Sequence, residues 1–230
     1  MNETICCNEA KLRRELVRFS RWLSRLGFTP GTSGNLSTRL DEERILVTPT
    51  GVSKGLIKAA DMVIVDLYGK LLSGTRRVTS EIGMHLVVYE QRANVRAVVH
   101  AHPAIATALA CSGRGLEEIL CQESAMTLGS VPLARYATTG TAEVPASLRP
   151  YLQEHDAILL ENHGAVSYGR SLEEAFMRME TLEHLAQVSL AAHQFGSPRP
   201  LTQTQLDELR KARINYHRNS DQAQEVEITV

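Results

Sequence analysis

The stretch "VVHAHP", residues 98–103, places two histidines one residue apart at the end of an apolar, β-branched run. Such a run predicts a strand. Because alternate side chains of a strand point to the same face, His100 and His102 are expected to lie close enough to bind one ion. By itself, a His-x-His pair in a strand is more often explained by packing and hydrogen bonding than by metal binding. The pair predicts a metal site only if the chain supplies a third ligand.

A third histidine follows another apolar segment, in "LLENHGAV" at residues 159–166. His163 lies in a predicted turn between two strands, and Gly164 beside it lets the backbone approach closely. Three neutral imidazoles would leave Zn²⁺, or another divalent ion, with an open coordination position for substrate. The remaining histidines are predicted to be surface or packing residues; they stand at positions 85, 155, 184, 193 and 217.

Three short segments rich in glycine and hydroxyl side chains are typical of anion sites. They are "GTSGNLS" at 31–37, "TPTG" at 48–51 and "VTS" at 78–80. Glycines let backbone N–H groups approach an anion, and small polar side chains add hydrogen bonds without bulk. Tight turns between strands have the same composition, and neither the P-loop nor the GxGxxG pattern of nucleotide-binding proteins is present. Ser80 favours the anion interpretation because it precedes a predicted helix, whose first N–H groups would face the ligand.

Glu81 directly follows this serine. A carboxylate at the start of a helix commonly only complements the helix dipole, a role that needs no active site. Beside a metal and a phosphate, the same carboxylate could move a proton on carbon, and burial is expected to raise its pKa toward the working range. Spacing alone leaves both roles open.

The order of the predicted elements indicates one mixed α/β domain over 1–230, with 200–230 as a C-terminal helix and tail. An apolar stripe at three- and four-residue intervals predicts an N-terminal helix ending at Gly27. The stripe consists of Leu12, Leu16, Phe19, Leu23 and Leu26. Turns and β-branched segments then predict several strands, followed by a helix over 81–92 with Ser80 as its N-cap. Further helices are expected at 103–110, 142–155, 171–195 and 201–216, with strands at 95–102 and on both sides of His163.

Composition excludes several classes of function. The 25 Lys+Arg and 26 Asp+Glu leave a formal charge of -1 with no long block of one sign, so neither nucleic acid nor an anionic membrane is an expected partner. No apolar run is long enough for a transmembrane helix, and the N-terminus does not resemble a signal peptide, so a cytoplasmic protein is expected. The four cysteines form no CxxC pair and are expected to be reduced thiols.

Taken in order, these motifs resemble the class II aldolase family, which includes L-fuculose-1-phosphate aldolase, L-ribulose-5-phosphate 4-epimerase and the head domain of adducin. The resemblance runs from the N-terminal helix through "GTSGNLS", "TPTG", "TSE", "VVHAH", "YATTGT" and "ENHG" to the helix that begins "SLEEAF". It implies an α/β fold in which helices flank a central, antiparallel-rich sheet in three layers. It also implies a homotetramer with active sites between neighbouring subunits.

The resemblance assigns roles to particular residues. It implies a zinc-dependent lyase in which His100, His102 and His163 bind the metal and Glu81 is the acid/base. The positions that match the family's phosphate site are Gly34, Asn35, Thr50, Gly51, Thr79 and Ser80. In the family a tyrosine of the C-terminal tail assists at the aldehyde oxygen, and Tyr216 is the nearest match here. The implied reaction is reversible cleavage of a ketose 1-phosphate, such as L-fuculose 1-phosphate, to dihydroxyacetone phosphate and a small aldehyde.

Two departures leave the sugar open. The fuculose enzyme carries an aromatic residue in the segment that here contains Cys121 and Gln122, and a phenylalanine where Thr139 stands. Fuculose, rhamnulose-like, ribulose and 5-deoxypentulose phosphates therefore stay possible substrates.

The reaction type is also open within the family. Family epimerases carry aspartate in place of Glu81, which favours the aldolase over a 4-epimerase. A 3-oxo-tetronate-phosphate decarboxylase and a thiosugar-phosphate dehydratase would use the same metal-stabilised enolate, so both stay possible. A non-enzymatic, adducin-like interaction module would lack the metal ligands and the acid/base, all of which this chain keeps.

Overall fold

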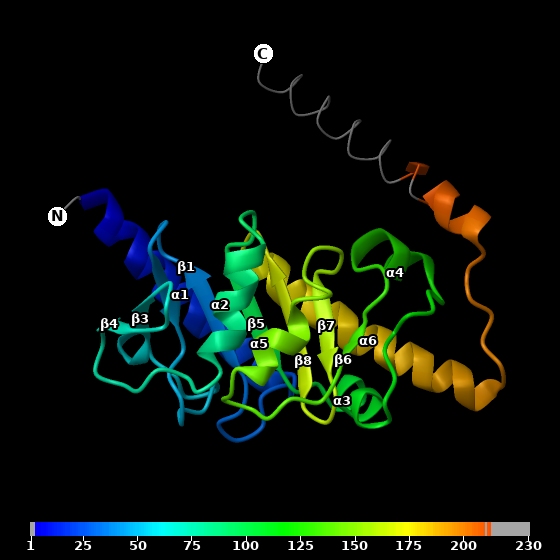
Figure 1. The fold of residues 1–230 in the computed structure, drawn as a ribbon, viewed down its shortest axis with the longest axis horizontal. Coiled ribbons are helices and arrows are strands. Elements are labelled where there is room, and N and C mark those ends of the chain that lie inside the picture. The colour runs from blue at the N-terminus through cyan, green and yellow to red at the C-terminus, as the bar shows by residue number, and fades with distance from the viewer. Residues whose placement is uncertain (1–2, 210, 213–230) are drawn as a thin grey trace, which may run out of the picture.

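A single eight-stranded sheet organises the protein, in a computed structural model that describes residues 3–209 and 211–212 (Figure 1). The strand order is β4-β3-β2-β1-β5-β8-β7-β6, and all neighbours are antiparallel except β6 and β7. The strands are β1 (Asn35–Arg39), β2 (Arg44–Val47), β3 (Val63–Asp66), β4 (Leu71–Ser73), β5 (Ala97–Ala101), β6 (Leu133–Ala134), β7 (Ala157–Leu160) and β8 (Gly164–Gly169). This is the antiparallel-rich sheet that the resemblance implied.

Helices cover both faces of the sheet, so the protein has three layers (Figure 1). The helices are α1 (Glu3–Arg25), α2 (Ile82–Gln91), α3 (Ala104–Cys111), α4 (Gln122–Thr127), α5 (Glu143–Leu148) and α6 (Leu172–Phe195), with a 3₁₀ turn η1 (Ala59–Asp61). Neighbouring strand residues enter opposite cores. Val99 packs with α1, α3 and α6, and Val98 packs with α2 and α5. Because both faces are buried, β5 (AVVHA) and β7 (AILL) are apolar almost throughout, whereas β1 (NLSTR) carries buried polar side chains.

The two long helices follow their sequence signals. Leu16, Phe19 and Leu23 of α1 are buried, whereas Leu26, beyond the last helical residue, is 44% exposed. Ser171, at which the helix over 171–195 was expected to begin, caps α6, because its side chain accepts a hydrogen bond of 3.1 Å from the Glu174 N–H. None of the described helices combines the length and the apolar character needed to cross a membrane.

The start of α2 differs from the prediction. The residue at the N-cap position is Glu81, and the predicted cap Ser80 lies one residue earlier, in an exposed turn. Thr79 closes this turn, because its carbonyl accepts from the Ile82 N–H at 3.3 Å and its Oγ1 accepts from the Glu81 N–H at 3.3 Å. The side chain of Thr79 thus accepts a backbone hydrogen bond, as was expected of Ser80. The helix begins one residue later than predicted, so Glu81 lies in the turn that precedes it.

Other boundaries were also predicted incorrectly. The helix expected over 142–155 ends at Leu148, since Pro150 lacks the N–H that would continue the helical hydrogen bonds. Helix α4 was not predicted at all. Strand β5 ends at Ala101, which leaves His102 just beyond it. Of the helix expected over 201–216, the structure describes helical turns at 203–209 and 211–212, and the remainder lies outside the described residues.

Candidate metal centre

Three histidines from two separate parts of the sheet meet at one point. His100 stands on the central strand β5, His102 follows it, and His163 lies in the turn between β7 and β8. One ring nitrogen from each lies within 4.8 Å of the other two, and the Nε2 atoms of His100 and His102 are 3.1 Å apart. In a tetrahedral zinc site with bonds of about 2.0–2.1 Å, ligand nitrogens are separated by roughly 3.3 Å. The three nitrogens form a cluster that could hold a single divalent ion.

The protonation of these rings suits metal binding. The Nδ1–H of His100 donates to the Ala165 carbonyl at 2.9 Å, which fixes the tautomer and turns the Nε2 lone pair toward the cluster. Burial lowers the pKa of His100 to about 3 and that of His102 to about 4, although the Glu81 carboxylate opposes the shift in both. Both rings are therefore neutral at physiological pH, as a metal ligand must be.

Local backbone conformation brings His163 to the other two histidines. Asn162 has a φ of 57°, a left-handed conformation that asparagine tolerates better than most residues. A Cβ on Gly164 would lie 2.6 Å from the Ala101 carbonyl oxygen and would also collide with the His102 ring. Glycine is thus required where β8 begins, which confirms the expected close approach at "NHG".

Glu81 lies against the same cluster. Its Oε1 is 3.0 Å from the Nε2 of His163, and its Oε2 is 3.4 Å from the Nε2 of His100. Burial by itself would raise the pKa of Glu81, but His100, His163 and the Asn35 amide outweigh it, and the net shift is downward. The expected upward shift was therefore wrong. Glu81 rests as a carboxylate, which is the form that accepts a proton.

Hydrogen bonds link the first two segments of the predicted phosphate site to each other, and the second segment to the residue that precedes the third. The Thr48 N–H donates to the Leu36 carbonyl at 3.0 Å, and the Thr50 N–H donates to the Arg77 carbonyl at 3.2 Å. Gly34 has a φ of 70°, and a Cβ there would lie 2.8 Å from the His100 carbonyl oxygen, so this loop packs directly on the metal-binding strand. The loops therefore adjoin the histidine cluster.

The predicted phosphate residues differ in where they lie. Gly51 and Ser80 are exposed, Thr50 is half-buried and Thr79 is 5% exposed. Asn35 is buried, and its Nδ2 donates to Glu81 Oε2 at 2.8 Å. The Asn35 amide therefore serves the carboxylate, a contact that the sequence did not predict.

Sequence reasoning missed two buried polar residues near these groups. Lys54 is 1% exposed and donates from Nζ to the Thr32 carbonyl at 3.1 Å and the Val52 carbonyl at 2.8 Å, so it joins two of the loops. Burial lowers the pKa of Lys54 to about 8, although Glu81 acts in the opposite direction. His85, expected to be an ordinary packing or surface residue, is fully buried and bonds to Asn35 and Ser37. Only its spacing of four from Glu81 on a helix could have indicated it.

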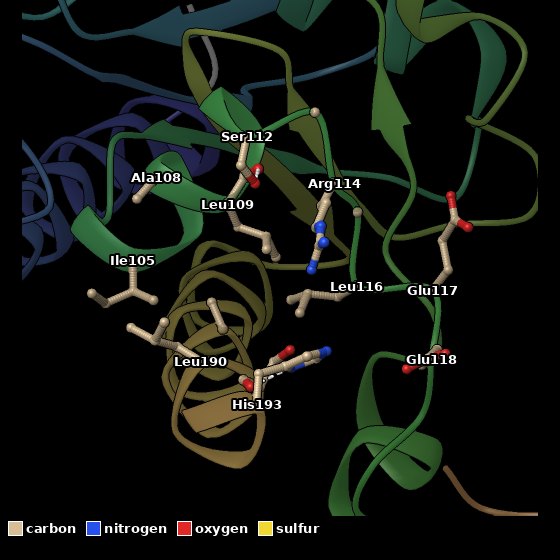
Figure 2. A pocket seen from close by; sticks show the side chains of 14 residues that line it. Ile105, Ala108, Leu109, Ser112, Arg114, Leu116, Glu117, Glu118, Leu190 and His193 are labelled. Carbon is tan, nitrogen blue, oxygen red and sulfur yellow. Dashed lines mark hydrogen bonds between the residues drawn. The ribbon is translucent and has the colours of Figure 1, made fainter. Parts of the chain in front are cut away.

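The remaining predicted site residue, Tyr216, lies outside the described residues. A cavity of about 730 Å³ lies elsewhere, between α3, the segment 112–118 and the second half of α6 (Figure 2). Leu109, Leu116 and Leu190 line it together with Arg114. No described residue of the metal centre or the phosphate loops borders this cavity, so its size does not make it the reaction site.

Comparison with known proteins agrees with this geometry. Residues 14–190 match the model of the "Class II Aldolase and Adducin N-terminal domain" family. The chain is 30% identical to a 5-deoxy-D-ribulose 1-phosphate aldolase of Bacillus thuringiensis over 90% of this chain and 97% of the relative. It is 32% identical to a 3-oxo-tetronate 4-phosphate decarboxylase of Pectobacterium atrosepticum, over 81% and 87%.

Solved structures agree as well. The structure of an L-fuculose 1-phosphate aldolase superposes with a TM-score of 0.82 at 32% identity, covering 88% of this chain and 95% of that one. The chain belongs to the class II aldolase and adducin family. It is an enzyme of the class II aldolase type, a group of metal-dependent lyases.

Proposed function

We propose that the protein is a zinc-dependent aldolase that reversibly cleaves a ketose 1-phosphate, L-fuculose 1-phosphate or a similar sugar, to dihydroxyacetone phosphate and a small aldehyde. The observation that carries this proposal is the position of the Glu81 carboxylate, 3.0 Å and 3.4 Å from the two histidines His163 and His100 of a three-imidazole cluster. A metal-binding cluster with an ionised carboxylate against it is suited to proton transfer beside a polarised carbonyl.

The proposed chemistry follows from these groups. Removal of the proton from the C4 hydroxyl breaks the bond between C3 and C4, releases the aldehyde and leaves an electron pair that resonance spreads from C3 to the C2 oxygen. A divalent ion held by His100, His102 and His163 would stabilise negative charge on the substrate oxygens. The Glu81 carboxylate takes up the proton lost by the C4 hydroxyl, delivers it to C3 to give dihydroxyacetone phosphate, and is left ionised again. In the condensation direction, the Glu81 carboxylate removes one C3 proton, which matches its ionised resting form.

The substrate phosphate is proposed to bind at the loops that carry Gly34, Thr50, Gly51, Thr79 and Ser80. The exposed Gly51 and Ser80 offer a backbone N–H and a hydroxyl as donors, and the buried Lys54 ammonium between two of the loops adds a positive charge. Asn35 is proposed to act mainly on Glu81, to which its amide donates.

The first test uses the half-reaction that needs no aldehyde. Dihydroxyacetone phosphate is incubated in D₂O with the zinc-loaded protein, and the two C3 hydrogens are followed by proton NMR. Loss of one hydrogen with stereospecificity, stopped by a chelator, is the expected result. No exchange by a protein that retains zinc would contradict the role given to Glu81.

A second candidate is decarboxylation of a 3-oxo-tetronate 4-phosphate, favoured by the relative that carries this name. Loss of CO₂ from such a substrate leaves the same electron pair beside a carbonyl, so the metal centre and Glu81 would keep their roles. The two candidates differ in the second product. Release of CO₂ from the oxo-acid with no condensation of dihydroxyacetone phosphate with any aldehyde would favour the decarboxylase.

We further propose that the enzyme works as a homotetramer with active sites between subunits, and that Tyr216 of a tail reaches the aldehyde oxygen. Tyr136 follows the short strand β6 and is 63% exposed, and its N–H donates to Glu161 beside the turn that carries His163. Tyr136 therefore offers apolar surface near the site for a neighbouring subunit.

A phosphorylated sugar does not cross a bilayer unaided, which supports a cytoplasmic enzyme. Light scattering after gel filtration tests the tetramer, and Tyr216→Phe tests the tail.

A further inference from the structure

A network of buried polar side chains, here called the polar network, extends from Glu81 into the protein through Asn35, His85, Ser37 and Tyr89. Asn35 Nδ2 lies 2.8 Å from Glu81 Oε2, and the Oδ1 of the same amide lies 2.5 Å from His85 Nε2. The other ring nitrogen of His85 lies 2.7 Å from Ser37 Oγ, which lies 2.8 Å from the Tyr89 hydroxyl. Every member behind Glu81 is at most 3% exposed. Asn35 and Ser37 belong to the predicted phosphate segment 31–37, whereas His85 and Tyr89 belong neither to the metal ligands nor to the phosphate loops.

The polar network depends on the regular spacing of polar residues along one helix and one strand. Glu81, His85 and Tyr89 are four residues apart at and beyond the start of α2, so they share one face. Asn35 and Ser37 are two apart on β1 and also share a face. Four residues advance a helix by about 6.0 Å and two advance a strand by about 6.6 Å. Because these two advances are nearly equal, successive polar side chains of the helix and of the strand lie opposite one another, and each contacts a partner.

The orientation of the Asn35 amide sets the direction of every hydrogen bond in the polar network. Its Nδ2 donates to Glu81 Oε2, so its Oδ1 faces His85 Nε2. Because Oδ1 only accepts, His85 must carry its proton on Nε2. Its Nδ1 then accepts from the Ser37 hydroxyl, which in turn accepts from Tyr89. All the donors point toward Glu81, and such aligned bonds reinforce one another.

We propose that His85 is a positioning residue for the reaction: its Nε2–H holds the Asn35 amide in the one orientation that donates to Glu81. This deepens the proposed function and rests on the role given there to Glu81. Without the His85 donor, rotation of the amide by 180° would place Oδ1 against the carboxylate and repel it from its place beside His163. Burial lowers the pKa of His85 to about 4, so the ring stays neutral at physiological pH and keeps an acceptor for Ser37.

Two substitutions separate this role from simple packing. The amide nitrogen of Gln in His85→Gln reaches about as far as Nε2 and can still donate to Asn35. The shorter side chain in His85→Asn reaches only the Ser37 side. Both variants remove the ring and place an amide in the same buried site. If His85 had a purely structural role, both substitutions would damage the packing, and the shorter side chain in His85→Asn would damage it more.

The experiment measures zinc content, kcat and KM for C3 proton exchange on dihydroxyacetone phosphate with the full-length, zinc-loaded enzyme. His85→Asn should lower kcat by about 10- to 100-fold, with zinc content and KM unchanged, and His85→Gln should restore kcat to within about threefold of the wild type. Equal loss in both variants, or loss of zinc in His85→Asn, would overturn the proposal.

A second measurement does not depend on activity or on the variants folding. In protein labelled with ¹⁵N-histidine, the His85 ring should show one bound proton, on Nε2, that exchanges slowly with solvent. A proton on Nδ1 instead would overturn the proposal. If the wild-type enzyme exchanges no C3 proton while His85 shows the Nε2–H tautomer, the proposed function fails and the orientation of Asn35 stands.

Discussion

The metal centre and the phosphate loops are adjacent but built on opposite principles. At the proposed metal centre the side chains would carry the chemistry, and they are buried or half-buried and partnered: His100 is fully buried, and its ring donates to the Ala165 carbonyl. At the proposed phosphate loops the backbone would do the binding, and residues such as Gly51 are exposed with nothing within 4 Å of an added Cβ. The difference teaches that substitutions at the first region should act on reactivity and at the second on binding and loop conformation.

The largest expected effect comes from removing a metal ligand. His100→Ala should weaken zinc binding by more than about 100-fold, because even residues that only support metal ligands contribute 10- to 100-fold. Proton exchange on dihydroxyacetone phosphate should fall to the level of chelated enzyme. His184→Ala, at an exposed position of α6, is the matched control and should retain both. Metal analysis by mass spectrometry checks the result, and full zinc content in His100→Ala would exclude this histidine as a ligand.

Glu81→Gln should separate chemistry from metal binding within the same region. The amide keeps the size of the side chain but cannot accept a proton, so exchange at C3 should fall by about 10²- to 10⁴-fold while zinc is retained. The exposed Glu173→Gln on α6 serves as a control for the change of charge. Exchange at the wild-type rate in Glu81→Gln would remove Glu81 from the reaction.

Substitution of two glycines tests how closely the phosphate loops pack against the strand that carries His100. Gly34 and Gly51 have φ values of 70° and 73°, so an added Cβ costs each about 1–2 kcal/mol of backbone strain. Only at Gly34 would the Cβ also collide, 2.7 Å from Thr29 Cγ2 and 2.8 Å from the His100 carbonyl oxygen. Gly34→Ala should therefore destabilise the fold by about 3 kcal/mol and Gly51→Ala by about 1 kcal/mol. Equal midpoints of urea unfolding would contradict the close packing at Gly34.

The smallest effect concerns the charge beneath the loops. Lys54 has its pKa lowered to about 8 by burial, so its ammonium is charged below this pH and neutral above it. A sugar phosphate is already a dianion above about pH 7. Because only the lysine loses its charge in this range, the KM for dihydroxyacetone phosphate should rise by about 3- to 10-fold between about pH 7.5 and pH 9.

The control for that prediction is Lys54→Met, which carries no charge at any pH. Its KM should be high at neutral pH and should not change over the same range. A wild-type KM that is flat across this range would show that the Lys54 charge does not act on the phosphate.

Much of the molecule was predictable because its signals are local. Apolar periodicity identified α1 and α6, and the strand "VVHAH" with the turn at "NHG" identified the three histidines. The antiparallel-rich sheet followed from the order of the motifs through the family resemblance. These features depend on residues that are neighbours in sequence or on motifs recognised as a set.

The errors arise where side chains meet across the fold. Burial alone predicted a raised pKa for Glu81, whereas His163 and Asn35, 82 and 46 positions away, lower it. Lys54 was overlooked because its partners are carbonyl groups of separate loops, which composition does not reveal. His85 resembled any histidine on a helix until Asn35 and Ser37 were found opposite it.

The measurement that tests the central claim most directly is the zinc X-ray absorption spectrum of the loaded wild-type enzyme. We predict three imidazole nitrogens at about 2.0–2.1 Å, together with oxygen ligands and no sulfur. Fewer than three imidazoles, or scattering from a cysteine sulfur, would contradict a metal centre made by His100, His102 and His163.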